Sequence, residues 1–97
     1  LAVDQDALGR QAVRVATFGS VDVYKKDLED GGWALGFFNR GDTPQAATFD
    51  KLHRIGISGK VHVRDLWRQA NLPDMQGNIP VSVAPHGVTL LKLTSAK

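Results

Sequence analysis

Residues 60–94 read KVHVRDLWRQANLPDMQGNIPVSVAPHGVTLLKLT, the longest uninterrupted series of strand and turn signals in the chain. Apolar and polar residues alternate up to Trp67, again from Ile79 to Val83, and again from Val88 to Leu93, which is the period of a β-strand. Asp65 interrupts the first run and indicates one irregular step. Residues suited to turns separate the runs: Asn71, Pro73, Asp74, Gly77, Asn78, Pro85, His86 and Gly87. The stretch therefore predicts a three-stranded antiparallel meander.

The residues before this stretch carry four more strand signals, at 13–16, 21–28, 33–40 and 46–49. Glu29-Asp30-Gly31-Gly32 is the clearest hairpin turn, because its glycines permit positive φ. The strand at 33–40 is apolar on both faces and is expected to be central and covered on both sides. Asp50–Ile55 has the spacing of one helical turn.

Seven short strands with a single helical turn predict an all-β fold, an antiparallel β-sandwich of about seven to eight strands with Greek-key-like connections. The alternation also selects a core from the apolar positions on one face of each strand. The expected core residues are Val21, Val23, Leu35, Phe37, Val63, Val81, Val83, Leu91 and Leu93.

The composition limits the kind of protein. A chain of 97 residues is expected to form one domain. It begins with Leu1 where a start Met is usual, so we expect it to be a processed or excised segment. Twelve Lys and Arg residues against ten Asp and Glu residues give a net charge of +2 without a basic stripe, so no nucleic-acid partner is predicted. The absence of cysteine excludes a disulfide framework. No apolar run approaches the ~20 residues that span a bilayer, so no membrane partner is predicted.

No motif for a metal, a cofactor or catalysis is complete. Asp4-Gln5-Asp6 resembles the start of a calcium loop, but the twelfth position is Val15 where a bidentate Glu is needed. His53, His62 and His86 have no partner at the spacing of metal ligands. We therefore expect no catalytic residue, no metal site and no cofactor in this chain.

Tyr24, Trp33 and Trp67 are the candidates for stacking against sugar rings, since flat aromatic faces on a β-sandwich can bind carbohydrate. The competing interpretation is packing in the core. Trp33 opens a strand that is apolar on both faces, and Trp67 ends a strand beside Leu66, so burial is favoured for both. Tyr24 lies among charged residues and is the best candidate for an exposed ring.

Five segments, in order, resemble one known family. They are LAVDQDALG (1–9), VDVYKKDL (21–28), WALGFFNRG (33–41), VRDLW (63–67) and APHGVTLLKL (84–93). Together they resemble the C-terminal end of the family 27 glycoside hydrolases, the α-galactosidase and α-N-acetylgalactosaminidase group. The resemblance implies a non-catalytic β-sandwich domain at 13–97, joined by a connector at 1–12 to a catalytic (β/α)₈ barrel. It also implies a secreted, periplasmic or lysosomal-type compartment.

The family's nucleophile and acid/base are two aspartates on barrel strands, so the resemblance gives none of this chain's aspartates a catalytic role. It implies that the domain's partner is the barrel of the same polypeptide, and that an α-galactoside substrate is bound only through that barrel. Phe38, Val88 and Leu90 are the candidates for facing the barrel, and they are expected to form an apolar patch exposed to water in the isolated chain. The alternative is a free-standing carbohydrate-binding or protein-interaction module, which would present at least two aromatic rings on one open surface.

Overall fold

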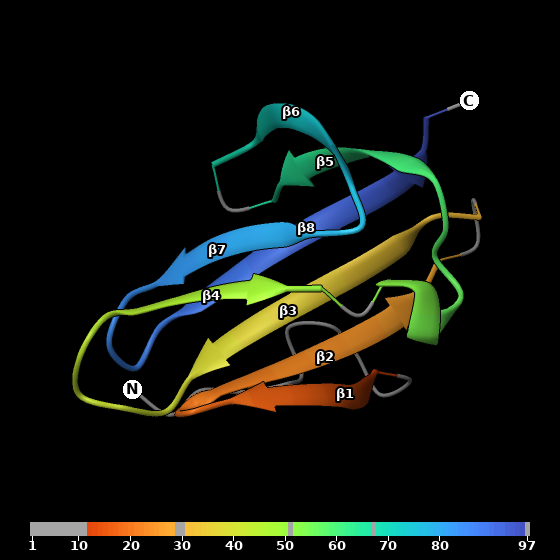
Figure 1. Ribbon diagram of the computed structural model, residues 1–97. Coiled ribbons are helices and arrows are strands. Elements are labelled where there is room, and N and C mark those ends of the chain that lie inside the picture. The colour runs from red at the N-terminus through yellow and green to blue at the C-terminus, as the bar shows by residue number, and fades with distance from the viewer. Residues whose placement is uncertain (1–11, 29–30, 51, 67, 97) are drawn as a thin grey trace.

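The computed structural model describes residues 12–28, 31–50, 52–66 and 68–96, which form an antiparallel sandwich of two unequal sheets (Figure 1). The larger sheet has six strands in the order β1-β2-β3-β8-β5-β6, and the smaller sheet pairs β4 with β7. The elements are β1 (Val13–Phe18), β2 (Val21–Asp27), β3 (Trp33–Asn39), β4 (Gln45–Phe49), the 3₁₀ helix η2 (Leu52–Ile55), β5 (Lys60–Asp65), β6 (Ala70–Gln76), β7 (Ile79–Val83) and β8 (Val88–Ser95). The predicted all-β sandwich is confirmed, and the predicted helical turn is η2.

The connections between the sheets give the Greek-key-like topology that was expected. β1, β2 and β3 follow one another across the larger sheet, with Gly19 at φ 56° in the two-residue turn between β1 and β2. The chain then enters the smaller sheet as β4, returns for the hairpin of β5 and β6, and leaves again as β7. It ends in β8, which lies between β3 and β5 (Figure 1). Of the predicted turn at 29–32, residues 29 and 30 lie outside the described residues.

The predicted meander between residues 60 and 94 is wrong. β5 pairs with β6 and with β8, whereas β7 pairs with β4 in the other sheet. The runs at β7 and β8 are strands, as expected, but they face each other across the sandwich and are not neighbours in one sheet. An alternating pattern shows which face of a strand is buried, and it does not identify the strand that pairs with it.

The segment that turn residues predict to be a loop contains strand β6. β6 is an edge strand, where Pro73 is tolerated because its missing N–H is not needed for pairing. Val61 pairs with Met75 and Val63 with Leu72, so β6 has one extra residue at this point. Leu72 and Met75 are therefore three residues apart, which hides the period of two. The irregular step lies here and not at Asp65, which continues the inward alternation of β5.

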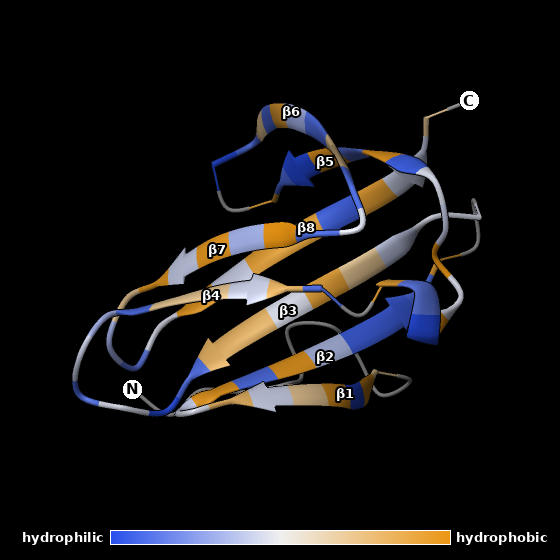
Figure 2. Cartoon of the chain, viewed as in Figure 1, coloured by the Kyte–Doolittle hydropathy of each residue, from blue (hydrophilic) through white to orange (hydrophobic). Residues whose placement is uncertain are grey.

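The main core lies between the two sheets. Its buried members are Val21, Val23, Leu35, Phe37, Phe49, Leu52, Ile57, Val61, Val63, Ile79, Val83, Leu91 and Leu93. All the predicted core residues belong to it except Val81, which is half-buried and packs against it. Figure 2 shows the apolar residues along β3 and β8, whereas the edge strand β6 is more polar.

A buried asparagine closes the sandwich where β3 ends. Asn39 is 0% exposed, and its Oδ1 accepts hydrogen bonds from the Ser20 hydroxyl and the Gly41 N–H, each at 2.8 Å. Its Nδ2 donates to the carbonyls of Thr43 at 2.8 Å and Val83 at 3.2 Å. One side chain thus fixes the β1–β2 turn, the loop after β3 and the end of β7. Its full set of partners offsets the cost of burying an amide.

Candidate functional site

The larger sheet has a second apolar face, which points away from the smaller sheet. Ala34, Phe38 and Leu90 are buried on it, with exposed fractions of 5%, 2% and 8%. The half-buried side chains of Ala12, Tyr24, Leu28 and Val88 pack against these three. The seven residues are termed the outer-face cluster below.

Local pairing explains why the side chains of this cluster fit together. Gly36 pairs with Tyr24 on one side and with Leu90 on the other, so the position between these two side chains carries no side chain of its own. The rings of Tyr24 and Phe38 meet edge to face, with centroids 5.4 Å apart and planes at 88°. This geometry is one of the favoured arrangements for aromatic pairs. The outer face is therefore packed and is not merely a row of apolar residues.

The expected exposed patch is absent at two of its three positions. Phe38 and Leu90 point away from the main core, as the alternation predicts, but both are buried within this chain. Val88 is half-buried. The expectation that Phe38 and Leu90 are exposed to water is wrong because neighbouring side chains on the same face cover them.

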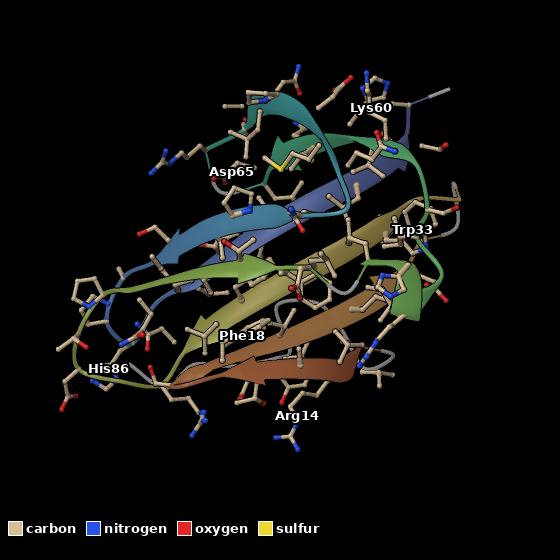
Figure 3. All side chains as sticks on the ribbon, viewed as in Figure 1. Arg14, Phe18, Trp33, Lys60, Asp65 and His86 are labelled. Carbon is tan, nitrogen blue, oxygen red and sulfur yellow. The ribbon has the colours of Figure 1, made fainter. Side chains whose placement is uncertain are left out.

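The two described candidates for sugar stacking lie on opposite faces of the larger sheet. Trp33 is half-buried and packs against the main core at the start of β3, near η2 (Figure 3). Tyr24 is half-buried and belongs to the outer-face cluster. Trp67, the third candidate, lies outside the described residues. Trp33 and Tyr24 therefore cannot form one stacking surface.

Several carboxylates are held in ion pairs and hydrogen bonds within the chain. Asp22 is 7% exposed, and its Oδ2 lies 2.9 Å from Nε of Arg40 while its Oδ1 accepts a hydrogen bond from the Thr17 hydroxyl at 3.1 Å. A carboxylate in a charge-assisted pair of this kind serves packing and orientation. This pair ties the β1–β2 hairpin to the residue after β3.

Two histidines also pair with aspartates. Nδ1 of His62 lies 2.8 Å from Asp74, and Nε2 of His86 lies 2.6 Å from Asp42. Among the described residues, no three His, Cys, Asp or Glu side chains gather in a group that could hold a metal ion. No helix in that part of the chain is long and apolar enough to cross a membrane.

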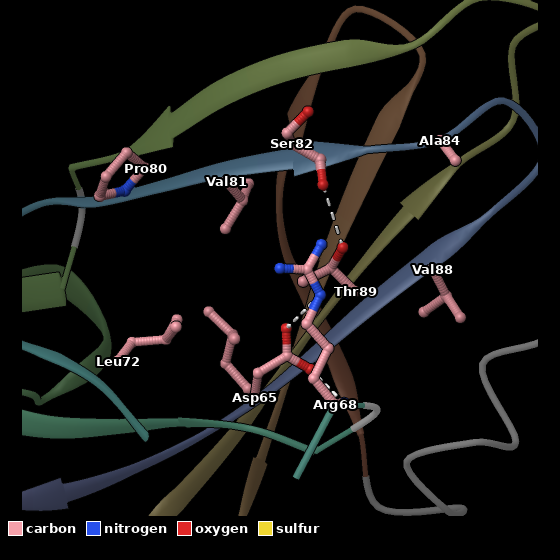
Figure 4. Close-up of a pocket in the computed structure, with 10 residues that line it drawn as sticks. Asp65, Arg68, Leu72, Pro80, Val81, Ser82, Ala84, Val88 and Thr89 are labelled. Carbon is pink, nitrogen blue, oxygen red and sulfur yellow. Dashed lines mark hydrogen bonds and ion pairs between the residues drawn. The ribbon is translucent and has the colours of Figure 1, made fainter. Parts of the chain in front are cut away.

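A cleft with a volume of about 360 Å³ opens between β7 and the end of β5 (Figure 4). It is lined by Asp65, Arg68, Leu72, Pro80, Val81, Ser82, Ala84, Val88, Thr89 and Leu91. The Asp65 side chain is only 12% exposed, and its Oδ1 accepts a hydrogen bond from the Arg68 N–H at 3.0 Å. Sequence reasoning missed this cleft, although a carboxylate at an inward position of β5 was a signal for it.

A second cleft, of about 390 Å³, lies on the outer face of β5, β6 and β8. Its polar lining includes His62, Arg64, Asn71, Asp74 and Lys92. Arg64 donates to Asn71 Oδ1 at 2.8 Å and to the Gln69 carbonyl at 3.0 Å. The outer face thus changes from apolar over β3 and the first half of β8 to charged over β5 and β6.

Comparison with known proteins gives consistent matches. The family model described as "Alpha galactosidase C-terminal beta sandwich domain" matches residues 18–93. The isomalto-dextranase of Arthrobacter globiformis is 33% identical over the whole chain, and an α-galactosidase of Oryza sativa is 35% identical over 97% of it. The chain spans only 16% and 22% of the lengths of these two relatives. In the crystal structure of α-galactosidase I from Mortierella vinacea, 23% of that chain superposes on 88% of this one, with a TM-score of 0.77 and 26% identity.

Proposed function

The chain belongs to the family of alpha galactosidase C-terminal beta sandwich domains, and on this premise we propose that it is the non-catalytic C-terminal domain of a larger glycoside hydrolase. The domain packs on a catalytic (β/α)₈ barrel in the same polypeptide and stabilises it, and the barrel hydrolyses terminal α-galactosides. The observation that carries this proposal is the family match over residues 18–93 of a chain that spans about a fifth of its enzyme relatives.

The outer face of the larger sheet is the face proposed to meet the barrel. A sheet that faced water here would carry polar residues at these positions, but β3 and β8 carry Phe38, Val88 and Leu90. Ala12, the first described residue, packs against this cluster, so the chain reaches β1 from the outer side of the sheet. This position of Ala12 supports the proposal that a preceding domain lies on this face.

The half-buried members of the cluster, Tyr24 and Val88, are proposed to make the direct contacts. Phe38 and Leu90 lie beneath them and set the shape of the surface. An interface between domains commonly covers about 600–1,500 Å². The charged region around Arg64 and Lys92 is proposed to lie at the edge of this interface.

Catalysis is assigned to the barrel. Glycoside hydrolysis needs two carboxyl groups that face each other across a bound sugar, about 5–10 Å apart. Asp22, Asp42, Asp65 and Asp74 each have a basic partner in this chain. These pairs support structural roles for the four carboxylates.

The test compares the whole gene product with a version that lacks residues 13–97 and with the 97-residue chain alone. Hydrolysis of p-nitrophenyl α-D-galactopyranoside and of dextran is measured, since the relatives include both α-galactosidases and an isomalto-dextranase. We expect α-galactoside hydrolysis by the whole protein, none by the chain, and aggregation or rapid inactivation after the deletion. Hydrolysis by the isolated chain, or a deletion that leaves stability unchanged, would refute the proposal.

A free-standing carbohydrate-binding or protein-interaction module is the alternative that the sequence leaves open. It would need at least two exposed rings on one surface. The described pair, Tyr24 and Trp33, lies on opposite faces. The observed placement therefore gives no support to a stacking platform made from these two.

A further inference from the structure

We propose that the cleft between β7 and the end of β5, termed the β7 cleft, binds one neutral sugar unit of an oligosaccharide. The inference rests on the lining of the cleft and is independent of any catalytic domain. Its volume of about 360 Å³ lies at the lower end of the ~300–1,000 Å³ found for small-molecule sites. A single pyranose ring is a ligand of that size.

The cleft exists because the smaller sheet has only two strands. β4 and β7 cannot cover the whole inner face of a six-stranded sheet, so Leu72 and Val81 remain half-buried, and they line the opening together with Leu91. These apolar side chains provide a wall for the C–H face of a sugar ring. The site is thus built by sheets of unequal width, and not by a mobile loop.

The free edge of β7 is closed to an added peptide strand. Pro80 lies opposite Thr48 of β4 and has no N–H to donate. The Ser82 carbonyl accepts a hydrogen bond from the Thr89 hydroxyl at 3.2 Å, so it points towards β8 and is already engaged (Figure 4). Both features are typical devices against edge pairing. A small molecule therefore fits this cleft better than an extended peptide.

The charges of the lining favour a neutral ligand. Asp65 and Arg68 contribute one negative and one positive group, which form an ion pair with Arg68 Nε 3.9 Å from Asp65 Oδ2. The two groups together carry no net charge, so neither an anion nor a cation gains a net attraction from the lining. Sugar hydroxyls both donate and accept, so one ring can donate to the carboxylate and accept from the guanidinium. The Ser82 carbonyl and the Thr89 hydroxyl, which are hydrogen-bonded to each other, add two further polar groups on the opposite side of the cleft.

The experiment is an NMR titration of the ¹⁵N-labelled 97-residue chain, whose main core is complete within the chain. Methyl α-D-galactopyranoside and methyl α-D-glucopyranoside are the neutral probes, and galacturonate and galactosamine are the charged ones. We expect saturable shifts at the amides of Arg68, Leu72, Ser82 and Thr89, with a Kd on the order of 1–10 mM for a neutral sugar. Each charged probe should bind at least about threefold more weakly.

Two variants with matched controls identify the site. Arg68→Ala and Thr89→Val should each weaken binding about threefold or more, since each removes one polar group from the lining. The controls Arg54→Ala on η2 and Thr48→Val on β4 change the same residue types at exposed positions outside the cleft and should leave binding unchanged. Dispersed wild-type-like spectra show that each variant is folded. Absence of saturable shifts at these amides, or equal loss in the controls, would overturn the proposal even if the domain proves to belong to a glycosidase.

Discussion

The two faces of the larger sheet are both apolar, but they are buried in different ways. On the inner face, Leu35 and Phe37 are 0% exposed because the smaller sheet and η2 cover them. On the outer face, Ala34 and Phe38 are 5% and 2% exposed beneath a single layer of half-buried side chains. Burial of a side chain therefore does not by itself show that it belongs to the core that holds the fold together.

The difference is informative because an antiparallel sheet needs only one apolar face to fold. The main core joins the two sheets, whereas the outer-face cluster joins neighbouring strands of one sheet. An apolar second face is expected where another domain packs on the sheet. Without such a domain, the exposed apolar surface would lower the solubility of the protein. The predictions below separate the contributions of the two faces, starting with the largest effect.

The largest effect is expected on the inner face. Phe37→Ala should lower the free energy of unfolding of the isolated chain by roughly 3–5 kcal/mol, because it leaves a cavity between two sheets. Phe38→Ala removes the same ring from the outer face, where the single covering layer can collapse, and should cost about 1–3 kcal/mol. Urea unfolding of both variants measures the difference. Equal losses would show that the outer face is as much a part of the folding core as the inner one.

The next effect concerns the polar end of the inner face. Asn39→Ala should lower the free energy of unfolding by roughly 2–4 kcal/mol, because it removes the four hydrogen bonds that this side chain makes with Ser20, Gly41, Thr43 and Val83. The exposed Asn71, whose side-chain Oδ1 accepts a hydrogen bond from Arg64, provides the control. Asn71→Ala should change stability by less than about 0.5 kcal/mol. Similar values for the two variants in urea unfolding would exclude a special role for Asn39.

The smallest effect is expected in the covering layer of the outer face. The edge-to-face contact between Tyr24 and Phe38 should contribute about 0.5–1.5 kcal/mol beyond the area that it buries. A double-mutant cycle with Tyr24→Leu and Phe38→Leu isolates this coupling energy. A coupling energy near zero would mean that the ring of Tyr24 is held only by burial.

The sequence was sufficient to predict the fold class, seven of the eight strands and most of the main core. Strict alternation at Val21–Val23, Leu35–Phe37 and Leu91–Leu93 marks the inner face directly. The sequence could not identify which strands pair, because alternation shows which face of a strand is buried and does not show which strand lies next to it. β6 was missed because its extra residue separates Leu72 from Met75 by three positions and because Pro73 suggests a loop.

The candidate surfaces were less predictable than the fold. The pattern placed Phe38 and Leu90 on the outer face, but their burial depends on Tyr24, Leu28 and Ala12, which come from other segments. The β7 cleft depends on the unequal widths of the two sheets, which only the strand order shows. The sequence pattern indicates an irregular step at Asp65, because the role of a carboxylate at an inward position can be inferred only when the groups that face it are known.

We propose that a preceding catalytic domain covers the outer face, and the substitution Val88→Asp is a direct test of this proposal. Val88 is half-buried in the outer-face cluster, whereas Val13 is 63% exposed on the edge strand β1 and provides the matched control Val13→Asp. The measurement is thermal inactivation of the whole gene product, compared with thermal unfolding of the 97-residue chain. We expect Val88→Asp to cost at least about 2 kcal/mol more stability in the whole protein than in the isolated chain, because a carboxylate would be buried without a partner at the interface. Val13→Asp should have the same small effect in both. If Val88→Asp destabilises the whole protein no more than it destabilises the chain, the outer face is not the surface that the catalytic domain covers.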